Sequence, residues 1–326
     1  MAIPCPDVAV RYRPYRAGDE ERILALYNAV FATSRTVAQW RWEYCENPQT
    51  RLDVVVAEAD AILVGHSAAV PMTMRHDGGQ IAGARVQNVF VHENFQRRGI
   101  FAETLVRLTR QLEAEAVDFV LTFPNDNSLP GFMRMGGYEH RFDVFSLALP
   151  LDRLGGAKSA DCTIEIGSPA SFRSADAAFA ARRLAPFAIY NLRSLEYLRW
   201  RYHANSGRTY RVLRVSRSGE QVGLAVAKAY AAGGSLDLVE FLVAPEQTLV
   251  RTALAALAKH FAPQRLERLS LWSLAHDPLH ACLREIGFVP QDRPTHVVTR
   301  TFSARCSRRC GEPQAYYLAM GDCDVY

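Results

Sequence analysis

The chain has 326 residues, of which 49% are hydrophobic and 22% charged, and its formal net charge is +4 at pH 7. This length favours two domains, and a mild charge spread along the chain excludes the basic block typical of nucleic-acid binding. No apolar run approaches the roughly 20 residues of a membrane helix, and the N-terminus lacks the apolar core of a signal peptide. We therefore expect a soluble, cytoplasmic protein that binds neither nucleic acid nor membranes.

The cysteines indicate a reducing environment. They number seven and are scattered, which favours free thiols over a disulfide framework. Cys306 and Cys310 form the only close pair, and no second His/Cys pair stands at ligand spacing. We expect surface thiols at these two positions and no metal site.

The first half of the chain predicts alternating helices and strands. The segment "GDEERILALYNAVF" begins a helix at the N-cap Asp19, and "VAQWRWEYCENP" predicts a second, short helix. Three β-rich segments follow, with turns at Asp60 and Asp77-Gly78-Gly79, which predicts an antiparallel meander. A helix from Gly99, an apolar strand, a short helix around residues 128–135 and a last strand complete the order α-α-β-β-β-α-β-α-β. The apolar face of the first helix consists of Ile23, Leu24, Tyr27, Val30 and Phe31.

The second half repeats this order. A linker rich in Gly, Ala and Ser, "LDRLGGAKSAD", marks a boundary near residues 151–160. A short segment also recurs: Trp40-Arg41-Trp42 resembles Trp200-Arg201-Tyr202. We predict two copies of one α+β unit. The predicted domains and the tail span residues 1–150, 160–302 and 303–326.

The string Gln96-Arg97-Arg98-Gly99 lies between a predicted strand and a predicted helix. Backbone N–H groups at a helix N-terminus, together with the positive end of the helix dipole, form an anion site. Gly99 lets a phosphate approach where a Cβ would intrude, and the arginines add charge. The alternative is a charged turn that only caps the helix.

This corner and the order of elements resemble motif A of the GNAT superfamily of CoA-dependent N-acyltransferases, written Q/R-x-x-G-x-G/A. Phe101 stands where the motif has its last small residue. The resemblance implies an α+β fold of two tandem GNAT-like domains, each a mostly antiparallel central sheet flanked by helices, with a degenerate second copy. It also implies acetyl-CoA or another acyl-CoA as cosubstrate and the primary amine of a small molecule as acceptor.

The resemblance further implies the residues that hold CoA. In the family, the strand before the corner splays from its neighbour and binds the pantetheine arm, while the corner binds the pyrophosphate. Carried over to this sequence, the cofactor-binding residues are Val89, Phe90, Val91, Gln96, Arg97, Arg98, Gly99, Ile100, Phe101 and Asn127. The matching stretch of the second half, "LVAPEQTLVRTAL", has no glycine and has Leu249 and Val250 at the phosphate position. We expect these two residues to be packing in a copy that does not bind CoA in this way.

The acid–base groups are less evident from the sequence. An amine resembling lysine has a pKa near 10.4, so about one molecule in a thousand is neutral at pH 7.4 and a base or a desolvating site is needed. GNAT enzymes often carry a glutamate on the fourth strand, but residues 83–91 contain no acid. The catalytic candidates are Gln87 and Asn88, which could hold an ordered water, and Asp126; other candidate bases are Glu240, Asp322 and Asp324. Each acid has the alternative of being a solvated surface group.

The family's usual general acid is a tyrosine, and Phe132 or Met133 stands at its position here. This departure is tolerable, because a thiol with a pKa near 8.5 can leave as thiolate with little help.

Aromatic residues mark the predicted second helix, which commonly borders the acceptor cleft in this superfamily. The candidate acceptor-binding residues are Trp40, Trp42, Tyr44 and Glu240. Aromatic faces suit sugars or bases, but indoles are usually buried, so at least two of the three aromatics are expected to be core anchors. A weak resemblance suggests a nucleotide-linked amino sugar as acceptor, with other small amines close behind. The alternatives are a protein-lysine acetyltransferase and a non-catalytic CoA-binding module, and the sequence leaves the oligomeric state open.

Overall fold

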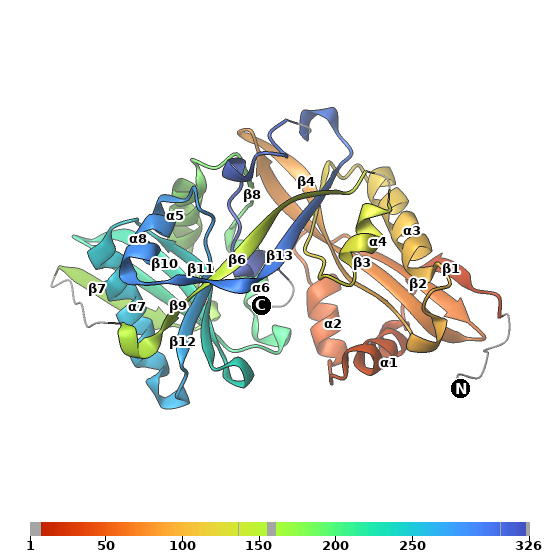
Figure 1. Cartoon of the computed structure of the whole chain (residues 1–326), viewed down its shortest axis with the longest axis horizontal. Coiled ribbons are helices and arrows are strands. Elements are labelled where there is room, and N and C mark those ends of the chain that lie inside the picture. Colours follow the sequence, from red (N-terminus) through yellow and green to blue (C-terminus); the bar gives the residue numbers. More distant parts are fainter. Residues whose placement is uncertain (1–7, 136, 155–160, 307, 324–326) are drawn as a thin grey trace. The chain divides into compact units, whose positions relative to one another are not determined.

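The computed structural model describes residues 8–135, 137–154, 161–306 and 308–323. The chain divides into two compact units (Figure 1). The first comprises residues up to Met74, Gln80–His140 and Val297–Arg308, and the second comprises Arg75–Gly79, Arg141–His296 and residues from Arg309 onward. No helix among the described residues combines the length and apolar character that spanning a membrane requires.

The first unit is a mixed sheet flanked by helices. Its strands lie in the order β1-β2-β3-β4-β5-β13. The β4–β5 pair is parallel, whereas β1–β2, β2–β3 and β5–β13 are antiparallel. Its elements are β1 (Arg11–Pro14), α1 (Glu20–Phe31), α2 (Val37–Tyr44), β2 (Asp53–Ala59), β3 (Ile62–His76), β4 (Gly79–Val91), η1 (Glu93–Phe95), α3 (Ile100–Ala114), β5 (Phe119–Thr122) and α4 (Leu129–Met133).

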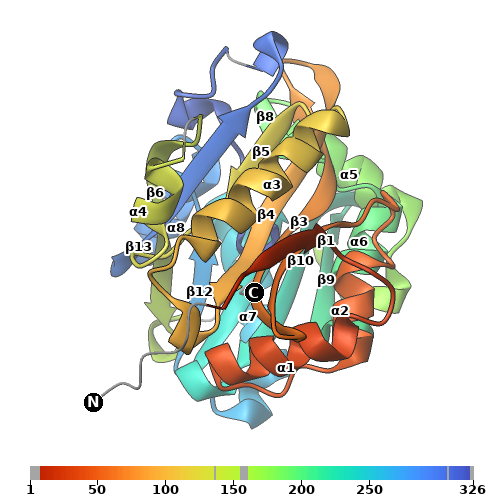
Figure 2. The same ribbon diagram turned by 90° about the vertical axis from the view of Figure 1, so that its right-hand side faces the viewer.

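Helix α3 covers one face of the sheet of the first unit, as Figure 2 shows, and its apolar side chains pack against that face to form the core. Its residues Leu105, Leu108 and Leu112 are fully buried. They recur at the spacing of one helical face and pack against sheet residues that include Val55 and Val120. The helix predicted to open at Gly99 is therefore present, and its apolar face fixes its position on the sheet.

The second unit repeats this plan. Its strands lie in the order β13-β6-β12-β11-β10-β9-β7, and β11–β12 is a parallel pair like β4–β5. Helix α7 connects the two parallel strands, as α3 does in the first unit. Its elements are β6 (Glu139–Pro150), β7 (Cys162–Gly167), α5 (Ser174–Leu184), β8 (Ile189–Asn191), α6 (Leu195–Arg201), β9 (Tyr210–Arg217), β10 (Glu220–Tyr230), β11 (Ser235–Val243), α7 (Gln247–Phe261), β12 (Arg268–Trp272), α8 (Pro278–Ile286) and β13 (Val289–Thr301). The predicted α+β fold of two related units is confirmed.

Three details differ from the sequence prediction. The strands β1, β7 and β8 were not expected, since they are short and lack an apolar run. The strand predicted to close the first copy, β6, pairs with β12 in the second unit. The end of β13, Val298–Thr301, pairs with β5 in the first unit. These pairings join strands that lie far apart in the sequence, and the local periodicity of a strand does not specify its distant partner.

The thiols of Cys306 and Cys310 were predicted to lie at the surface, and this was wrong. Both residues are buried, at 0% and 1% exposure. The Tyr316 hydroxyl donates to the Cys310 carbonyl oxygen at 2.8 Å, and the Cys310 sulfur lies 3.6 Å from His76 Nε2. The prediction failed because a free cysteine packs like a small apolar residue and is therefore often buried.

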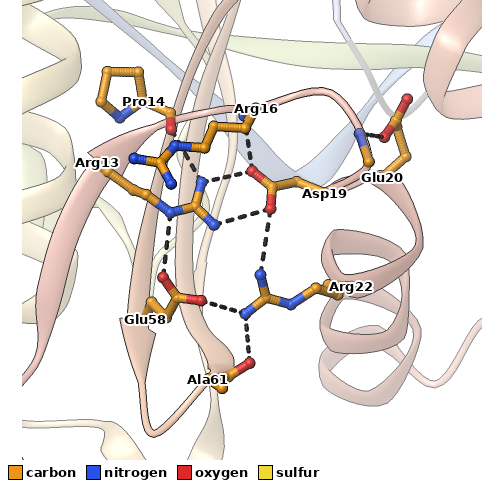
Figure 3. A network of polar contacts seen from close by, with 9 residues as sticks. Arg13, Pro14, Arg16, Asp19, Glu20, Arg22, Glu58 and Ala61 are labelled. Carbon is orange, nitrogen blue, oxygen red and sulfur yellow. Dashed lines mark hydrogen bonds and ion pairs between the residues drawn. The ribbon is translucent and has the colours of Figure 1, made fainter.

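A buried network of ion pairs attaches α1 to the sheet (Figure 3). Asp19 occupies the N-cap position of α1, as predicted, but its carboxylate does not cap the backbone N–H groups of the helix and contacts α1 through the Arg22 side chain at 3.4 Å. It instead accepts two hydrogen bonds from Arg13 of β1, at 2.6 and 2.9 Å. Arg13 also donates to Glu58 of β2 at 3.2 Å, and Arg22 of α1 pairs with the same Glu58. The hydrogen bond from Arg13 holds the pKa of Asp19 below its ordinary value, although burial opposes this shift.

We predict that Arg13→Met lowers the free energy of unfolding by about 3 kcal/mol at pH 7, because it leaves Asp19 buried without its main partner. The more exposed Arg22 is the control, and Arg22→Met should cost about 1 kcal/mol or less. Since the folded-state pKa of Asp19 is lowered, the contribution of the pair is present above its ordinary pKa and is lost as the pH falls through the folded value. Urea unfolding of both variants from pH 7 to 3 checks this. Equal losses for the two variants would contradict it.

Candidate functional site

The site begins where two strands of the first unit separate. The parallel β4–β5 ladder runs from Gly83 opposite Phe119 to Val86 opposite Thr122, where β5 ends. Strand β4 continues to Val91. Beyond Val86, the edge of β4 that faced β5 has no β5 partner, so its backbone N–H and C=O groups can bond to a ligand.

A groove with a volume of about 540 Å³ opens at this separation. Nine of the ten residues predicted to bind the cofactor line it: Val89, Phe90, Val91, Gln96, Arg97, Gly99, Ile100, Phe101 and Asn127. Its opposite wall comes from the chain after β5 and includes Asn125, Ser128, Gly131 and Arg134. The predicted strand, corner and helix start therefore share one cavity.

The corner at the start of α3 has the backbone expected of an anion site. Gly99 is the N-cap of α3 with φ +76°, and Arg97 also has a positive φ of +63°. The first intrahelical bond runs from the Glu103 N–H to the Gly99 carbonyl oxygen, at 3.0 Å. The preceding N–H groups of the first turn therefore have no acceptor within the helix. A Cβ added at Gly99 would meet no protein atom within 4 Å, so the positive φ is what favours glycine at this position.

The two arginines of the corner point to different places. Arg97 lines the groove, whereas Arg98 does not and instead has its guanidinium 5.1 Å from the ring centre of Phe95. Arg134, from the opposite wall, adds a second positive charge to the groove lining. Arg134 was not among the predicted site residues, because no motif marks it.

Phe101 packs directly against a glycine of α4. A Cβ built on Gly131 would lie 2.6 Å from Phe101 Cε1, so any larger residue here requires the ring to shift. Phe101 also packs edge-on against Phe132 at 5.8 Å. The bulky residue at the last motif position is thus matched by a small residue in α4.

A buried polar cluster lies around a distortion of β4. Asn88 has φ +52°, and its amide nitrogen lies 2.6 Å from the Tyr44 hydroxyl and 3.3 Å from a Glu43 carboxylate oxygen. Glu43 is 5% exposed and pairs with Arg35. Burial would raise the pKa of Glu43, but Arg35, together with Arg85 and Gln87, holds this pKa below its ordinary value. Tyr44 was among the predicted site residues but Glu43 was not, although Glu43 directly follows Trp42.

His66 connects the polar cluster to the groove. Its Nδ1–H donates to the Asn88 carbonyl oxygen at 2.7 Å, and its ring stacks on Phe90, which lines the groove, at 4.8 Å. Its Nε2 is buried and has no hydrogen-bond partner among the described residues. Burial lowers the pKa of His66 to about 4, so the ring is neutral at physiological pH.

The remaining predicted residues lie in several places. Trp40 and Trp42 are buried at 1% and 3% exposure, and Trp40 stacks on Tyr15 at 5.1 Å. Gln87 is also buried, with its amide nitrogen 3.4 Å from the Tyr44 hydroxyl. Asp126 is exposed in the loop between two groove residues.

The acids proposed from the second half belong to the second unit. Glu240 and Asp322 are buried, and both pair with Arg193, at 2.9 and 2.8 Å. Burial raises the pKa of Glu240. Asp324 lies outside the described residues. The expectation of packing at Leu249 and Val250 agrees with their exposures of 1% and 0%.

Phe31 was predicted on the apolar face of the first helix, α1, but much of its side chain is exposed. It is 49% exposed and lines the groove, where its ring contacts Phe90 edge-on at 5.5 Å. Tyr27 packs against the same two rings. An open aromatic surface at the groove therefore comes from α1, and the tryptophans of α2 do not supply it.

A mixed sheet whose parallel pair separates beside a helix that starts on glycine is the arrangement of a GNAT-type acyltransferase. Residues 11–141 match the family model of the acetyltransferase (GNAT) domain. This match spans most of the first unit, which therefore carries a GNAT-type acetyltransferase domain.

Solved structures share the fold over nine-tenths of the chain. A probable N-acyltransferase from Enterococcus faecalis is 14% identical with a TM-score of 0.71, and a GCN5-related N-acetyltransferase from Anabaena variabilis is 12% identical with a TM-score of 0.70. Each match covers 90% of this chain and 73% of the other. A tandem GNAT protein from the clavulanic acid biosynthesis pathway is 17% identical with a TM-score of 0.60, covering 90% of this chain and 98% of the other. No curated protein sequence matches the chain.

The fit of Phe101 to Gly131 generates a prediction. Gly131→Ala should destabilise the wild-type protein, because the added methyl meets the Phe101 ring, but should stabilise a Phe101→Ala background, where alanine only improves helix propensity. The expected coupling between the two positions is about 1 kcal/mol or more in a double-mutant cycle measured by urea unfolding. Additive effects of the two substitutions would show that the ring has room to move aside.

Proposed function

We propose that the protein transfers an acetyl group from acetyl-CoA, or another acyl group from its acyl-CoA, to the primary amine of a small metabolite. The observation that supports this most strongly is the groove of about 540 Å³, which combines the free edge of β4 with the N-terminus of α3. Its volume lies within the usual range for small-molecule sites.

The residues present fit an acyl-CoA. The N–H groups at the start of α3, with Gly99 and Arg97, would hold the pyrophosphate, and Arg134 would add charge from the facing wall. The backbone of Val89–Val91 would bind the pantetheine arm as an additional strand would. An acyl-CoA supplies an activated thioester carbonyl carbon that an amine can attack.

We further propose that the acceptor amine binds beside Asn88. The amide nitrogen of Asn88 is engaged by Tyr44 and Glu43, which fixes the side chain and leaves its amide oxygen as an acceptor for an ammonium group or a water. The Glu43 carboxylate adds negative charge close by, partly offset by Arg35. Gln87 and Asn88 would thus orient the amine or a water that accepts its proton, without a carboxylate on β4.

For the acceptor class, we propose a nucleotide-linked amino sugar first and other small amines second. The exposed ring of Phe31 beside the groove offers a face on which a sugar or a base could stack.

The alternatives are lysine side chains of proteins as acceptors, and loss of catalysis with CoA binding retained. Release of CoA thiol from acetyl-CoA with amino-sugar nucleotides, simple amines or lysine peptides separates these possibilities. Turnover with peptides alone would contradict the small-molecule proposal, and CoA binding without any turnover would contradict catalysis.

We predict that Gly99→Val weakens CoA binding by about 3 kcal/mol, because the branched side chain enters the open space where the phosphates would bind. Gly78→Val is the matched control, since Gly78 has φ +78° and open surroundings in the β3–β4 turn. Both variants should strain the backbone, but only the first should lose CoA affinity. Arg97→Ala should weaken binding more than Arg98→Ala, because Arg98 does not line the groove. Isothermal titration with CoA measures all four, and unchanged affinity in Gly99→Val would contradict the assignment.

A second prediction concerns the amides of β4. Asn88→Ala and Gln87→Ala should slow turnover about tenfold to a hundredfold while leaving CoA affinity unchanged, as expected of groups that position a proton acceptor. Leu249→Ala is the control for general destabilisation, because it removes packing in the second unit. It should lower the melting temperature without slowing turnover at 25 °C. Complete loss of activity in Asn88→Ala, with intact CoA binding, would show that Asn88 is indispensable and contradict the modest positioning role.

A further inference from the structure

The second unit has a polar pocket of about 440 Å³ on the face of its own sheet. The strand register builds it from two rows of side chains. Lys228, Asp237 and Ser270 lie side by side on β10, β11 and β12, and the adjacent row consists of Tyr230, Ser235 and Arg268. Strands β6 and β13 contribute further polar residues, among them Arg293 and Thr295.

The other face of the same strands is apolar. Leu236 and Leu238 of β11 and Leu269 and Leu271 of β12 are buried in the core that contains the leucines of α7. Alternation along each strand therefore separates a leucine face from a charged face. On the charged face, Lys228, Ser235 and Asp237 are themselves buried, at 7%, 3% and 3% exposure. Because burying charged groups has a cost, their presence in a pocket favours a role in binding a polar ligand.

The pocket carries more positive than negative charge. Lys228 is 7% exposed, and its nitrogen lies 3.8 Å from a carboxylate oxygen of Asp237. The Ser235 hydroxyl donates to the other Asp237 oxygen at 2.7 Å. Arg268 and Arg293 form no ion pair within the described part of the chain. Three cations thus face one carboxylate, which leaves a surplus of two positive charges.

We propose that this pocket binds a phosphorylated small molecule, with its phosphate between Lys228, Arg268 and Arg293 and its hydroxyl groups on Ser235, Ser270 and Thr295. A phosphate monoester is close to a dianion at neutral pH and matches the surplus charge. Arginine presents a planar set of donors that fits phosphate oxygens. The serine and threonine hydroxyls can both donate and accept, as a sugar or polyol requires. All of these residues belong to the second unit, so the site is separate from the CoA groove of the first.

The protonation of Lys228 provides an independent signal. Burial and the nearby Arg208 and Arg201 lower the pKa of Lys228 to about 8, and Asp237 opposes them. Besides Asp237, the other titratable or charged groups that line the pocket are Tyr230, Arg268 and Arg293. A bound phosphate raises this pKa, so binding at pH 8 should take up a fraction of a proton, whereas binding at pH 6, where Lys228 is already protonated, should take up almost none from it.

The test is isothermal titration of the full chain with glucose 6-phosphate, inorganic phosphate, gluconate and glucose. We expect saturable binding of glucose 6-phosphate, weaker binding of inorganic phosphate and gluconate, and no binding of glucose. Lys228→Met and Arg268→Gln should each weaken glucose 6-phosphate binding about tenfold or more. Arg217→Gln, at an arginine of β9 paired with Glu246 outside the pocket, should leave it unchanged. Arg97→Ala, in the first unit, should also leave it unchanged.

Proton uptake is measured by repeating the titration at pH 8 in two buffers of different ionisation enthalpy. The uptake should disappear in Lys228→Met. No saturable binding of glucose 6-phosphate, or binding that is unaffected by both pocket variants, would overturn the proposal. Tighter binding of gluconate or glucose than of glucose 6-phosphate would overturn the choice of phosphate.

Discussion

The separation of β4 from β5 is the constraint on which the site depends. Two parallel strands that pair only as far as Val86 and Thr122 leave a length of β4 backbone that must find other partners. The chain then turns through positive φ at Arg97 and Gly99 and starts α3 at the end of that free edge. A line of hydrogen-bonding backbone and a set of free helix N–H groups are thereby placed in one groove. Side chains refine this arrangement, but the backbone creates it.

The second unit shows what the same plan becomes without that corner. Helix α7 again connects a parallel pair, but Glu246 at its N-cap has an extended backbone, and Leu249 and Val250 are buried in the core. The helix start is therefore closed by packing. The second unit instead has charged residues on one face of its sheet, around Lys228 and Arg268. One fold thus supports two different kinds of polar site, because strand alternation and the helix terminus can be changed independently.

The sequence predicted those features that local pattern encodes. The corner around Gly99, the amphipathic α3 and the repeated order of elements all follow from short-range spacing. Short strands such as β1 and the pairings of β6 and β13 depend on distant partners, which periodicity cannot specify. Glu43 and Arg134 were not predicted from the sequence either, because only the fold brings them to the polar cluster and the groove. The burial of Trp40 and Trp42 followed the general preference of indoles, and the exposure of Phe31 did not follow its apolar spacing.

The central claim is that CoA binds along β4 and at the start of α3, and hydrogen–deuterium exchange tests it most directly. Addition of CoA should slow exchange of the backbone amides of residues 89–91 and 97–102, because these groups would bond to the ligand. The amides of residues 247–250, at the start of α7, should be unaffected. Protection at α7, or no protection at the start of α3 under saturating CoA, would contradict this account of the protein.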